Sequence, residues 1–322
     1  MNTETVLHIN DLCTNFFVDK GIVRAVHNVN LRIRKGECLG LVGESGCGKS
    51  MTALSILRLV PSPPGKIVDG QILFKDQDLL QLSEKMMKKI RGKDIAMIFQ
   101  EPSASMNPAF SIGNQIQELI RLHQNSARKT IIQKSIESLR AVQISDPKRI
   151  LGQYPHELSG GMLQRVMIAM AIACLPALLI CDEPTTALDI SIQAQILELL
   201  NDLAQKRQTS LLFITHDLGV LNWICDSAAV MYAGSIIEYS DIRSILSNPL
   251  HPYTQALIES TPRFDTNPDK LKVIIGQVPD LVNLPPGCRF QPRCPKADAD
   301  CKINYPTMEE KATQHWVACH RV

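Results

Sequence analysis

Short apolar runs recur along the chain and alternate with stretches of helical spacing. Five of these runs are apolar enough to be strands buried on both faces. They occupy residues 37–42, 95–99, 177–181, 210–215 and 228–232. Helical patterns follow two of them, at residues 51–60 and 190–206. This alternation predicts an α/β fold built on a mostly parallel sheet.

The rest of the chain departs from this rhythm. Short β-like runs separated by turns lead from residue 6 to the first buried strand. Between residues 111 and 173 apolar residues fall at helix spacing, which predicts a helical insert in the α/β core. After Ser247 the chain is rich in proline, holds four cysteines and keeps helical spacing only near residues 253–260. We therefore expect a boundary near residue 250 and a small, loop-rich accessory domain after it.

Composition and charge exclude several classes of protein. A content of 45% hydrophobic and 20% charged residues is typical of a globular chain and excludes a disordered or collagen-like one. Lys+Arg 34 nearly balance Asp+Glu 32, and no basic stretch stands out in the sequence. We therefore expect no nucleic-acid partner.

The sequence also bears on membranes and compartment. The longest uncharged stretch, residues 166–181, is too short to span a bilayer and predicts a buried helix followed by a buried strand. Residues 1–10 lack the basic and apolar regions of a secretory signal. We expect the chain to stay in the cytoplasm, where its ten cysteines are free thiols or metal ligands rather than disulfides.

A glycine-rich loop lies between the first buried strand and a helix, where a phosphate-binding loop is expected. Its glycines let backbone N–H groups surround phosphate oxygens, and the helix start attracts anions. Lys49 would reach the β and γ phosphates, and Ser50 would bind Mg²⁺. The loop residues are Gly43, Glu44, Ser45, Gly46, Cys47, Gly48, Lys49 and Ser50.

Two further groups of residues predict the rest of a nucleotide site. Asp182 ends a buried strand and would hold Mg²⁺, directly or through water, while the adjacent Glu183 would polarise the attacking water. Ser159, Gly160 and Gly161 precede an apolar helix and would offer a hydroxyl and bare N–H groups to a second phosphate.

In this setting Leu158–Gly161 resembles the signature of the ATP-binding-cassette (ABC) ATPases, and residues 6–240 follow that family's order of motifs. The resemblance implies a P-loop NTPase fold with a RecA-like core, a β-subdomain and a helical subdomain at about residues 101–175. It implies ATP and Mg²⁺ as cofactors, and it adds site residues. These are Gln100, which senses Mg²⁺ and the attacking water, Asp189 in a D-loop at residues 186–189, His216 at the γ-phosphate, and Phe16 or its rival Phe17 against adenine.

The same resemblance implies a head-to-tail dimer. ATP on the phosphate loop of one subunit would be capped by the signature of the other, and hydrolysis would loosen the pair. The chain would then hydrolyse ATP poorly by itself.

Four more stretches, at residues 100–108, 154–162, 251–257 and 284–295, resemble one branch of the family, the ATPase subunits of oligopeptide/dipeptide and nickel importers. This resemblance implies an ABC ATPase domain at residues 1–250 and an oligopeptide-importer-type C-terminal domain at residues 251–322. It also implies two transmembrane permease subunits, a second ATPase subunit and, indirectly, an extracytoplasmic solute-binding protein. The chain would lie at the cytoplasmic face of the membrane as a peripheral subunit.

Two alternatives to peptide import stay open. One is the import of nickel or another small solute by the same class of importer. The other is an ABC ATPase of DNA repair or translation, but such proteins usually carry two cassettes or a long insertion. This chain has one phosphate loop and one signature, which favours transport.

Four cysteines in the proline-rich segment form a further candidate site. The spacing of Cys288, Cys294, Cys301 and Cys319 differs from the paired C-x₂-C pattern of common zinc sites. The importer resemblance implies a [4Fe–4S] cluster on these thiolates, as in some members of that branch. Zinc, with His315 or His320 able to replace one cysteine, is the rival, and four unligated cysteines are the remaining alternative.

Overall fold

The computed structural model describes residues 4–185, 189–260 and 274–322. These residues form two compact units, each described by itself below. The first unit holds the chain up to Glu4, Arg34–Glu37 and Leu82–Leu212. The second holds Thr5–Ile33, Cys38–Gln81 and Phe213–Val322. The chain passes from the first unit to the second within strand β8 (Ser210–Thr215).

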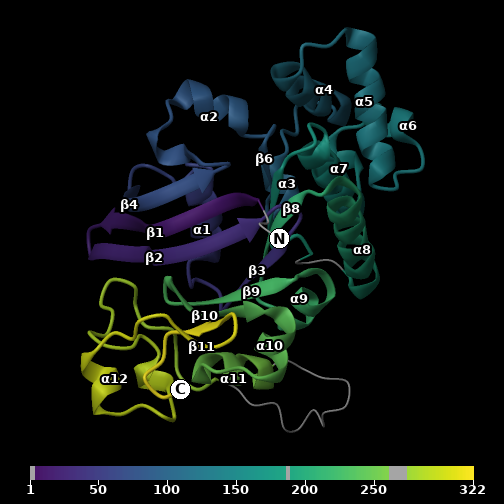
Figure 1. Cartoon of the computed structure of the whole chain (residues 1–322). Helices are drawn as coiled ribbons and strands as arrows, with labels where there is room; N and C mark the ends of the chain where they lie inside the picture. Colours follow the sequence, from purple (N-terminus) through teal and green to yellow (C-terminus); the bar gives the residue numbers. More distant parts are fainter. Residues whose placement is uncertain (1–3, 186–188, 261–273) are drawn as a thin grey trace. The chain divides into compact units, whose positions relative to one another are not determined.

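Helices dominate the first unit. Helices α4 to α7 pack against one another, and α8 runs beside α7 (Figure 1). Ile112, Ile116 and Ile120 recur at helix spacing on α4 and are fully buried, which explains why this segment folds as an amphipathic helix. The helices are α2 (Glu84–Ile90), α3 (Pro102–Ser105), α4 (Ile112–His123), α5 (Arg128–Ala141), α6 (Pro147–Gly152), α7 (Gly160–Ile172) and α8 (Ile190–Arg207), with a 3₁₀ turn at Pro155–Glu157.

Two buried strands of the first unit run parallel. Strand β6 (Ile95–Ile98) pairs with β7 (Leu178–Asp182), with Ile95 opposite Leu178 and Ile98 opposite Cys181. Because parallel strands end at the same edge of a sheet, the residues that follow β6 and β7 emerge close together. This register positions one half of the candidate site.

The second unit begins with a four-stranded sheet in the order β2-β1-β4-β5. Its strands are β1 (Thr5–Val18), β2 (Gly21–Arg34), β4 (Gly65–Phe74) and β5 (Gln77–Asp78), followed by a 3₁₀ turn at Leu79–Gln81. The expectation of short β-like runs before residue 42 was wrong in one respect. Strands β1 and β2 each extend over 14 residues, and each buries alternate side chains along much of its length.

Five neighbouring strands of a second sheet lie in this unit, in the order β11-β12-β10-β9-β3. Strand β3 (Cys38–Val42) is buried throughout and runs parallel to β9 (Ser227–Tyr232), and β9 pairs antiparallel with β10 (Ser235–Asp241). The helices of the unit are α1 (Lys49–Ile56), α9 (Leu218–Ile224), α10 (Ile242–Ser247), α11 (Pro252–Ser260) and α12 (Ala299–Ile303), with a 3₁₀ turn at Gln291–Arg293.

The first helix of the second unit is shorter than its sequence pattern predicts. The pattern extends to residue 60, but α1 ends at Ile56. Arg58 adopts a left-handed backbone conformation with φ 53, which a continuing helix excludes.

The C-terminal segment is more regular than expected, because it contains α12 and a hairpin of β11 (Glu309–Ala312) and β12 (His315–Val317). A buried carboxylate joins this hairpin to β10. Glu238 accepts hydrogen bonds from the N–H groups of Leu250 and His251 at 2.7 and 2.9 Å, and it contacts His315 Nε2 at 2.7 Å. Strand β12 has three residues, too few for a periodic signal, and its register is set by pairing with β10.

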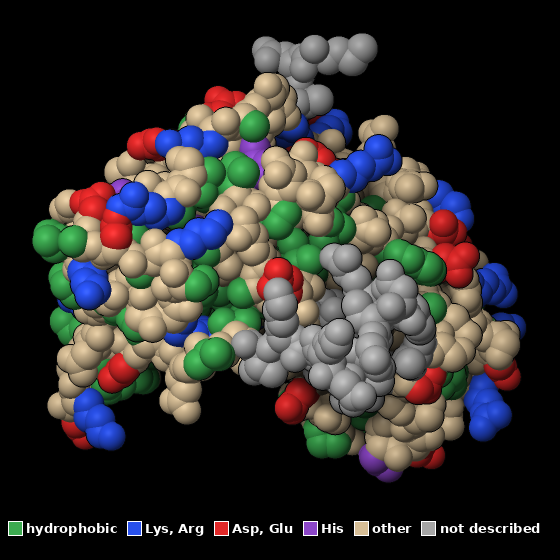
Figure 2. Space-filling view, turned by 90° about the horizontal axis from the view of Figure 1, so that it is seen from below, with side chains coloured by type: hydrophobic (Ala, Val, Ile, Leu, Met, Phe, Trp, Pro, Cys, Tyr) green, Lys and Arg blue, Asp and Glu red, His purple; other side chains and the backbone are tan. Residues whose placement is uncertain are grey.

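The face of the molecule in Figure 2 carries charges of both signs. In Figure 2 lysine and arginine side chains are interspersed with aspartate and glutamate over the face in view. In the described part of the chain, helices fall short of the length or the apolar character that crossing a bilayer requires.

Candidate nucleotide site

The phosphate loop closes around the ammonium group of Lys49. Strand β3 leads into the loop, and Lys49 Nζ donates to the carbonyl oxygens of Gly43 at 2.7 Å and Glu44 at 3.0 Å. These bonds curl the backbone back on itself just before α1. The first N–H groups of a helix have no acceptor within it, so the start of α1 is suited to bind an anion.

Two positions of the loop have room only for glycine. A Cβ at Gly43 would lie 2.2 Å from the carbonyl oxygen of Met231, and one at Gly48 would lie 2.3 Å from that of Ala25. Gly48, the residue before α1, also has φ 109, which side chains rarely tolerate. The backbone of the loop is therefore confined by strands β9 and β2 of its own unit.

The remaining loop positions differ in exposure. Ser45 and Gly46 are exposed, and Ser50 is half-buried at the start of α1. Cys47 is fully buried, and burial raises the pKa of its thiol although Lys49 opposes that effect. Cys47 is therefore a neutral, space-filling residue.

In the first unit Gln100 and Glu183 are brought into contact. Gln100 Nε2 donates to Glu183 Oε2 at 3.0 Å, just beyond the ends of β6 and β7. Asp182, the last residue of β7, is 5% exposed, and Glu183 leaves the strand with φ 46. A carboxylate fixed by an amide in this way is suited to orient a water molecule.

Gln164 of α7 is a residue of this region to which the sequence assigned no role. Its side chain is 2% exposed, and Nε2 donates to the carbonyl oxygen of Pro184 at 2.5 Å. This bond ties the helix after the signature to the segment that carries Glu183. A polar residue in a mostly apolar helix was the available signal.

The predicted signature residues stand at the start of α7. Ser159 caps the helix and its Oγ accepts the N–H of Met162 at 3.4 Å. Gly160 has open space around it, whereas a Cβ at Gly161 would lie 3.1 Å from the side chain of Ile192 on α8. Gly161 thus allows α7 and α8 to approach closely, and Gly160 leaves backbone accessible to a ligand.

The other predicted site residues lie in several elements. Asp189 caps α8 by accepting the N–H of Ile192 at 2.9 Å, while residues 186–188 of the predicted D-loop lie outside the described residues. His216 follows β8 and is exposed. Phe16 is half-buried opposite Gly65 in β4, and Phe17 is 50% exposed.

The four tail cysteines influence one another electrostatically. Burial and, to a smaller extent, the neighbouring Cys301, Cys319 and Cys294 together raise the pKa of Cys288 to about 11. Burial also raises the pKa values of Cys301 and Cys319, with a contribution from Cys294 to each. Within the described ranges, however, groups of three or more His, Cys, Asp or Glu side chains placed to hold a metal ion are absent.

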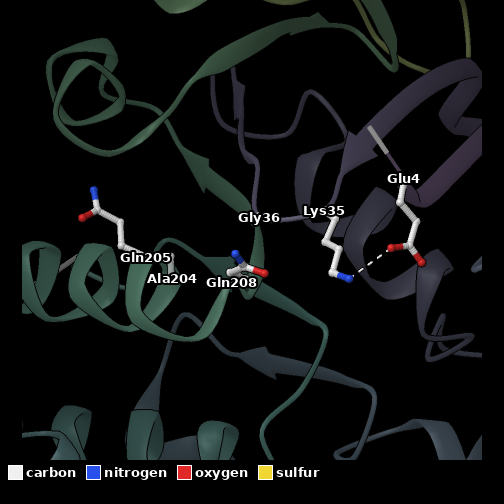
Figure 3. Close-up of a pocket in the computed structure, with 6 residues that line it drawn as sticks. All are labelled: Glu4, Lys35, Gly36, Ala204, Gln205 and Gln208. Carbon is white, nitrogen blue, oxygen red and sulfur yellow. Dashed lines mark hydrogen bonds and ion pairs between the residues drawn. The ribbon is translucent and has the colours of Figure 1, made fainter. Parts of the chain in front are cut away.

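A pocket of about 400 Å³ lies elsewhere in the first unit (Figure 3). An ion pair of 3.1 Å between Lys35 and Glu4 lies at one side of it, and Gln205 of α8 and Gln208, which follows that helix, lie at the other. The lining residues are Glu4, Lys35, Gly36, Ala204, Gln205 and Gln208, and none is a predicted site residue.

One buried strand leads into a glycine-rich loop that closes around a lysine, and a second buried strand ends at Asp182, which Glu183 follows. This combination defines a P-loop nucleoside triphosphatase. Comparison with known proteins refines this class. Residues 26–186 match the family model described as ABC transporter, and residues 237–301 match that of the oligopeptide/dipeptide transporter C-terminal region.

Full-length relatives support the match. The chain is 50% identical to the oligopeptide transport ATP-binding protein AppD of Bacillus subtilis, over 98% of this chain and 96% of that protein. It is 46% identical to the dipeptide transport ATP-binding protein DppD of the same organism, over 98% and 94%. A dimeric structure of the ATP-binding cassette MJ0796 bound to ADP and Pi covers 74% of this chain and 99% of its own, with 25% identity and a TM-score of 0.66.

The chain therefore belongs to the ABC transporter family of ATP-binding proteins. The prediction of an α/β fold of the ABC ATPase type is confirmed by the structural match.

The glycines of the loop give a matched pair of variants. We expect Gly48→Ala to weaken ATP binding at least about tenfold, because a strained backbone costs about 1–3 kcal/mol and the new Cβ would collide with the Ala25 carbonyl. Gly46 has φ 78 with nothing within 4 Å, so Gly46→Ala should cost less. Equilibrium binding of a fluorescent ATP analogue measures both. Equal losses in the two variants would contradict the role given to the backbone contact.

Proposed function

We propose that this chain is the ATP-hydrolysing subunit of an ABC importer for dipeptides or oligopeptides. The observation that carries the proposal is the succession of an ABC ATPase region and an oligopeptide-type C-terminal region in one chain. Relatives that cover nearly its whole length are named as transport ATP-binding proteins for oligopeptides and dipeptides. Their names favour peptides over nickel, which the sequence left open.

Several residues of the chain have the chemistry that phosphoryl transfer to water requires. Lys49 carries a positive charge for the phosphates, and Ser50 and Asp182 offer oxygen ligands suited to Mg²⁺, which would neutralise phosphate charge. Glu183 polarises the attacking water, and the contact with Gln100 fixes its carboxylate. His216 follows β8 and serves as a contact for the γ-phosphate.

In this proposal transport is driven by the association of two ATPase subunits rather than by cleavage of the phosphate bond itself. In our proposal two ATPase subunits meet head to tail, and Ser159, Gly160 and Gly161 of one cap the nucleotide of the other. The start of α7 supports this role, because Ser159 and Gly160 are exposed and nothing lies within 4 Å of a Cβ built at Gly160. Asp189, which caps α8, lies in the same unit and completes the shared surface.

The assembly includes partners beyond this chain. We propose two transmembrane permeases, which the ATPases drive from the cytoplasmic face of the membrane, and a solute-binding protein that acts on the far side. The division into an ATPase domain at residues 1–250, with a helical subdomain at about 101–175, and a C-terminal domain at residues 251–322 also stays a proposal. Phe16 is our choice for the adenine contact, since its side chain is partly buried and less exposed than that of Phe17, which is 50% exposed.

The tail cysteines form the finer part of the proposal. We place a [4Fe–4S] cluster on Cys288, Cys294, Cys301 and Cys319, with zinc as the rival. Mutual electrostatic influence among the four thiols supports it, and so does the N–H of Cys288, which donates to the carbonyl oxygen of Cys301 at 2.8 Å. Ligation requires the side chains to draw closer than they lie here, because no described group has the spacing of a metal site. A cluster would cross-link and stabilise the C-terminal segment, which has little apolar core of its own.

Removal of the catalytic carboxylate tests the ATPase assignment. We expect Glu183→Gln to preserve ATP binding and to lower kcat by about 10²–10⁴-fold, because the amide still accepts from Gln100 but does not act as a base. Steady-state hydrolysis by the complex with co-purified permeases measures this. The control is Glu198→Gln on the exposed side of α8, which should keep wild-type turnover. Wild-type turnover in Glu183→Gln would refute the role.

Metal analysis of protein purified without air tests the cysteine site. We expect iron and sulfide in about a 1:1 ratio and a brown chromophore that is lost when any of the four cysteines is changed to serine. Cys174→Ser, in the other unit, is the control and should retain the colour. Stoichiometric zinc without iron would overturn the cluster and keep the four-ligand site, and absence of both metals would overturn the site.

A further inference from the structure

The C-terminal segment sends one side chain into the phosphate loop. Arg293 lies in the 3₁₀ turn at Gln291–Arg293, 249 residues along the chain from Glu44. Its guanidinium donates from Nη1 to Glu44 Oε2 at 2.7 Å and from Nη2 to Glu44 Oε1 at 3.0 Å. Such a bidentate pair is the strongest arrangement that arginine and a carboxylate adopt, and it fixes orientation as well as distance.

All five N–H groups of this guanidinium have acceptors. Besides Glu44, the guanidinium donates to the carbonyl oxygens of Ile274 and Ile275 at 3.3 and 3.1 Å and to the hydroxyl of Tyr232 at 3.3 Å. The side chain of Arg293 is 4% exposed, while that of Glu44 is 28% exposed. The bond to Glu44 raises the pKa of Arg293 further, so the guanidinium stays charged. A lysine could not reproduce this fork of donors.

A second contact from the C-terminal half reaches the same loop residue. Tyr253, in the first turn of α11, accepts the backbone N–H of Glu44 at 2.9 Å. The carbonyl oxygen of Glu44 accepts from Lys49 on the opposite side. The N–H, the carbonyl and the carboxylate of Glu44 are thus each held by a different side chain.

An aromatic cluster supports these two contacts. The rings of Tyr232 and Tyr253 lie 4.6 Å apart between centroids, and Phe290 meets each of them edge-on at 5.3 and 5.4 Å. Tyr232, Tyr253 and Phe290 are nearly or fully buried, so Arg293 is anchored on a rigid apolar base. The guanidinium also lies over the rings of Tyr232 and Phe290 at 5.9 and 6.0 Å.

We infer that Arg293 is a positioning residue of the nucleotide site, which neutralises Glu44 and holds the phosphate loop in the shape that binds ATP. A free carboxylate at the second loop position would repel the phosphates of ATP, and pairing with a buried guanidinium removes that repulsion. The inference rests on the proposed function, since it concerns the binding of ATP by this loop.

The position of Arg293 makes ATP binding depend on the folded C-terminal segment. The residue lies between Cys288 and Cys294, and the N–H of Arg293 donates to the carbonyl oxygen of Phe290 at 3.0 Å. Loosening of this segment would withdraw the guanidinium and leave the charge of Glu44 unpaired. The C-terminal region therefore contributes to the nucleotide site and is not only an appendage of the ATPase.

The test compares variants of the full chain purified with its partner subunits. Arg293→Gln should raise the Kd for a fluorescent ATP analogue and the KM for ATP about tenfold, with kcat changed much less because the groups at Glu183 are untouched. Arg293→Lys should give an intermediate loss. Arg243→Gln, an exposed arginine of α10, is the matched control and should leave both constants unchanged.

The decisive result is rescue. Glu44→Gln combined with Arg293→Gln should bind ATP more tightly than Arg293→Gln alone, because the unpaired charge is gone; a purely structural role of Arg293 would not give this recovery. If Arg293→Gln melts early, Arg293→Lys and Tyr253→Phe carry the test, since each should weaken ATP binding in a folded chain. Wild-type affinity in these variants, or a double variant no better than the single one, would overturn the inference. A wild-type complex that binds no ATP would overturn the proposed function as well.

Discussion

The reversal of the chain around Lys49 is the constraint on which the rest of the site depends. Two carbonyl oxygens of the loop accept hydrogen bonds from the ammonium group. The loop can adopt this path only because positions 43 and 48 are glycines, since a Cβ at either position would collide with neighbouring backbone. Strand β3 fixes the start of the loop and α1 its end. The phosphate site is therefore a property of the folded unit and not of the loop sequence alone.

The phosphate loop is also held by the C-terminal segment of the chain. Glu44 faces the C-terminal segment, where Arg293 and Tyr253 hold it, and its carbonyl faces Lys49. In the other unit two glutamines hold the segment that carries Glu183. Gln100 donates a hydrogen bond to the carboxylate of Glu183, and Gln164 donates one to the carbonyl oxygen of Pro184. Glu44 and Glu183 are thus each oriented by a polar side chain from a distant segment.

Local patterns predicted the strand, the loop and the helix of the phosphate site, because strand, glycine loop and helix are adjacent in sequence. The contact between Gln100 and Glu183, 83 residues apart, was not predicted, and the rule that parallel strands end at the same edge of a sheet explains it. The pair of Arg293 and Glu44 spans 249 residues and joins a turn to a loop, for which sequence offers no periodicity. Hairpin β11–β12 was missed for a similar reason: its register is set by β10, a long-range partner.

The central claim is that the C-terminal region holds Glu44 in place within the phosphate loop. Hydrogen exchange of the Glu44 amide in the wild-type chain without nucleotide tests it most directly, because that N–H donates to Tyr253 and to no helix or strand. The account predicts exchange far slower than in an unstructured peptide of the same sequence, and a return toward the peptide rate in Tyr253→Phe. Exchange of the wild-type amide at the peptide rate would contradict it.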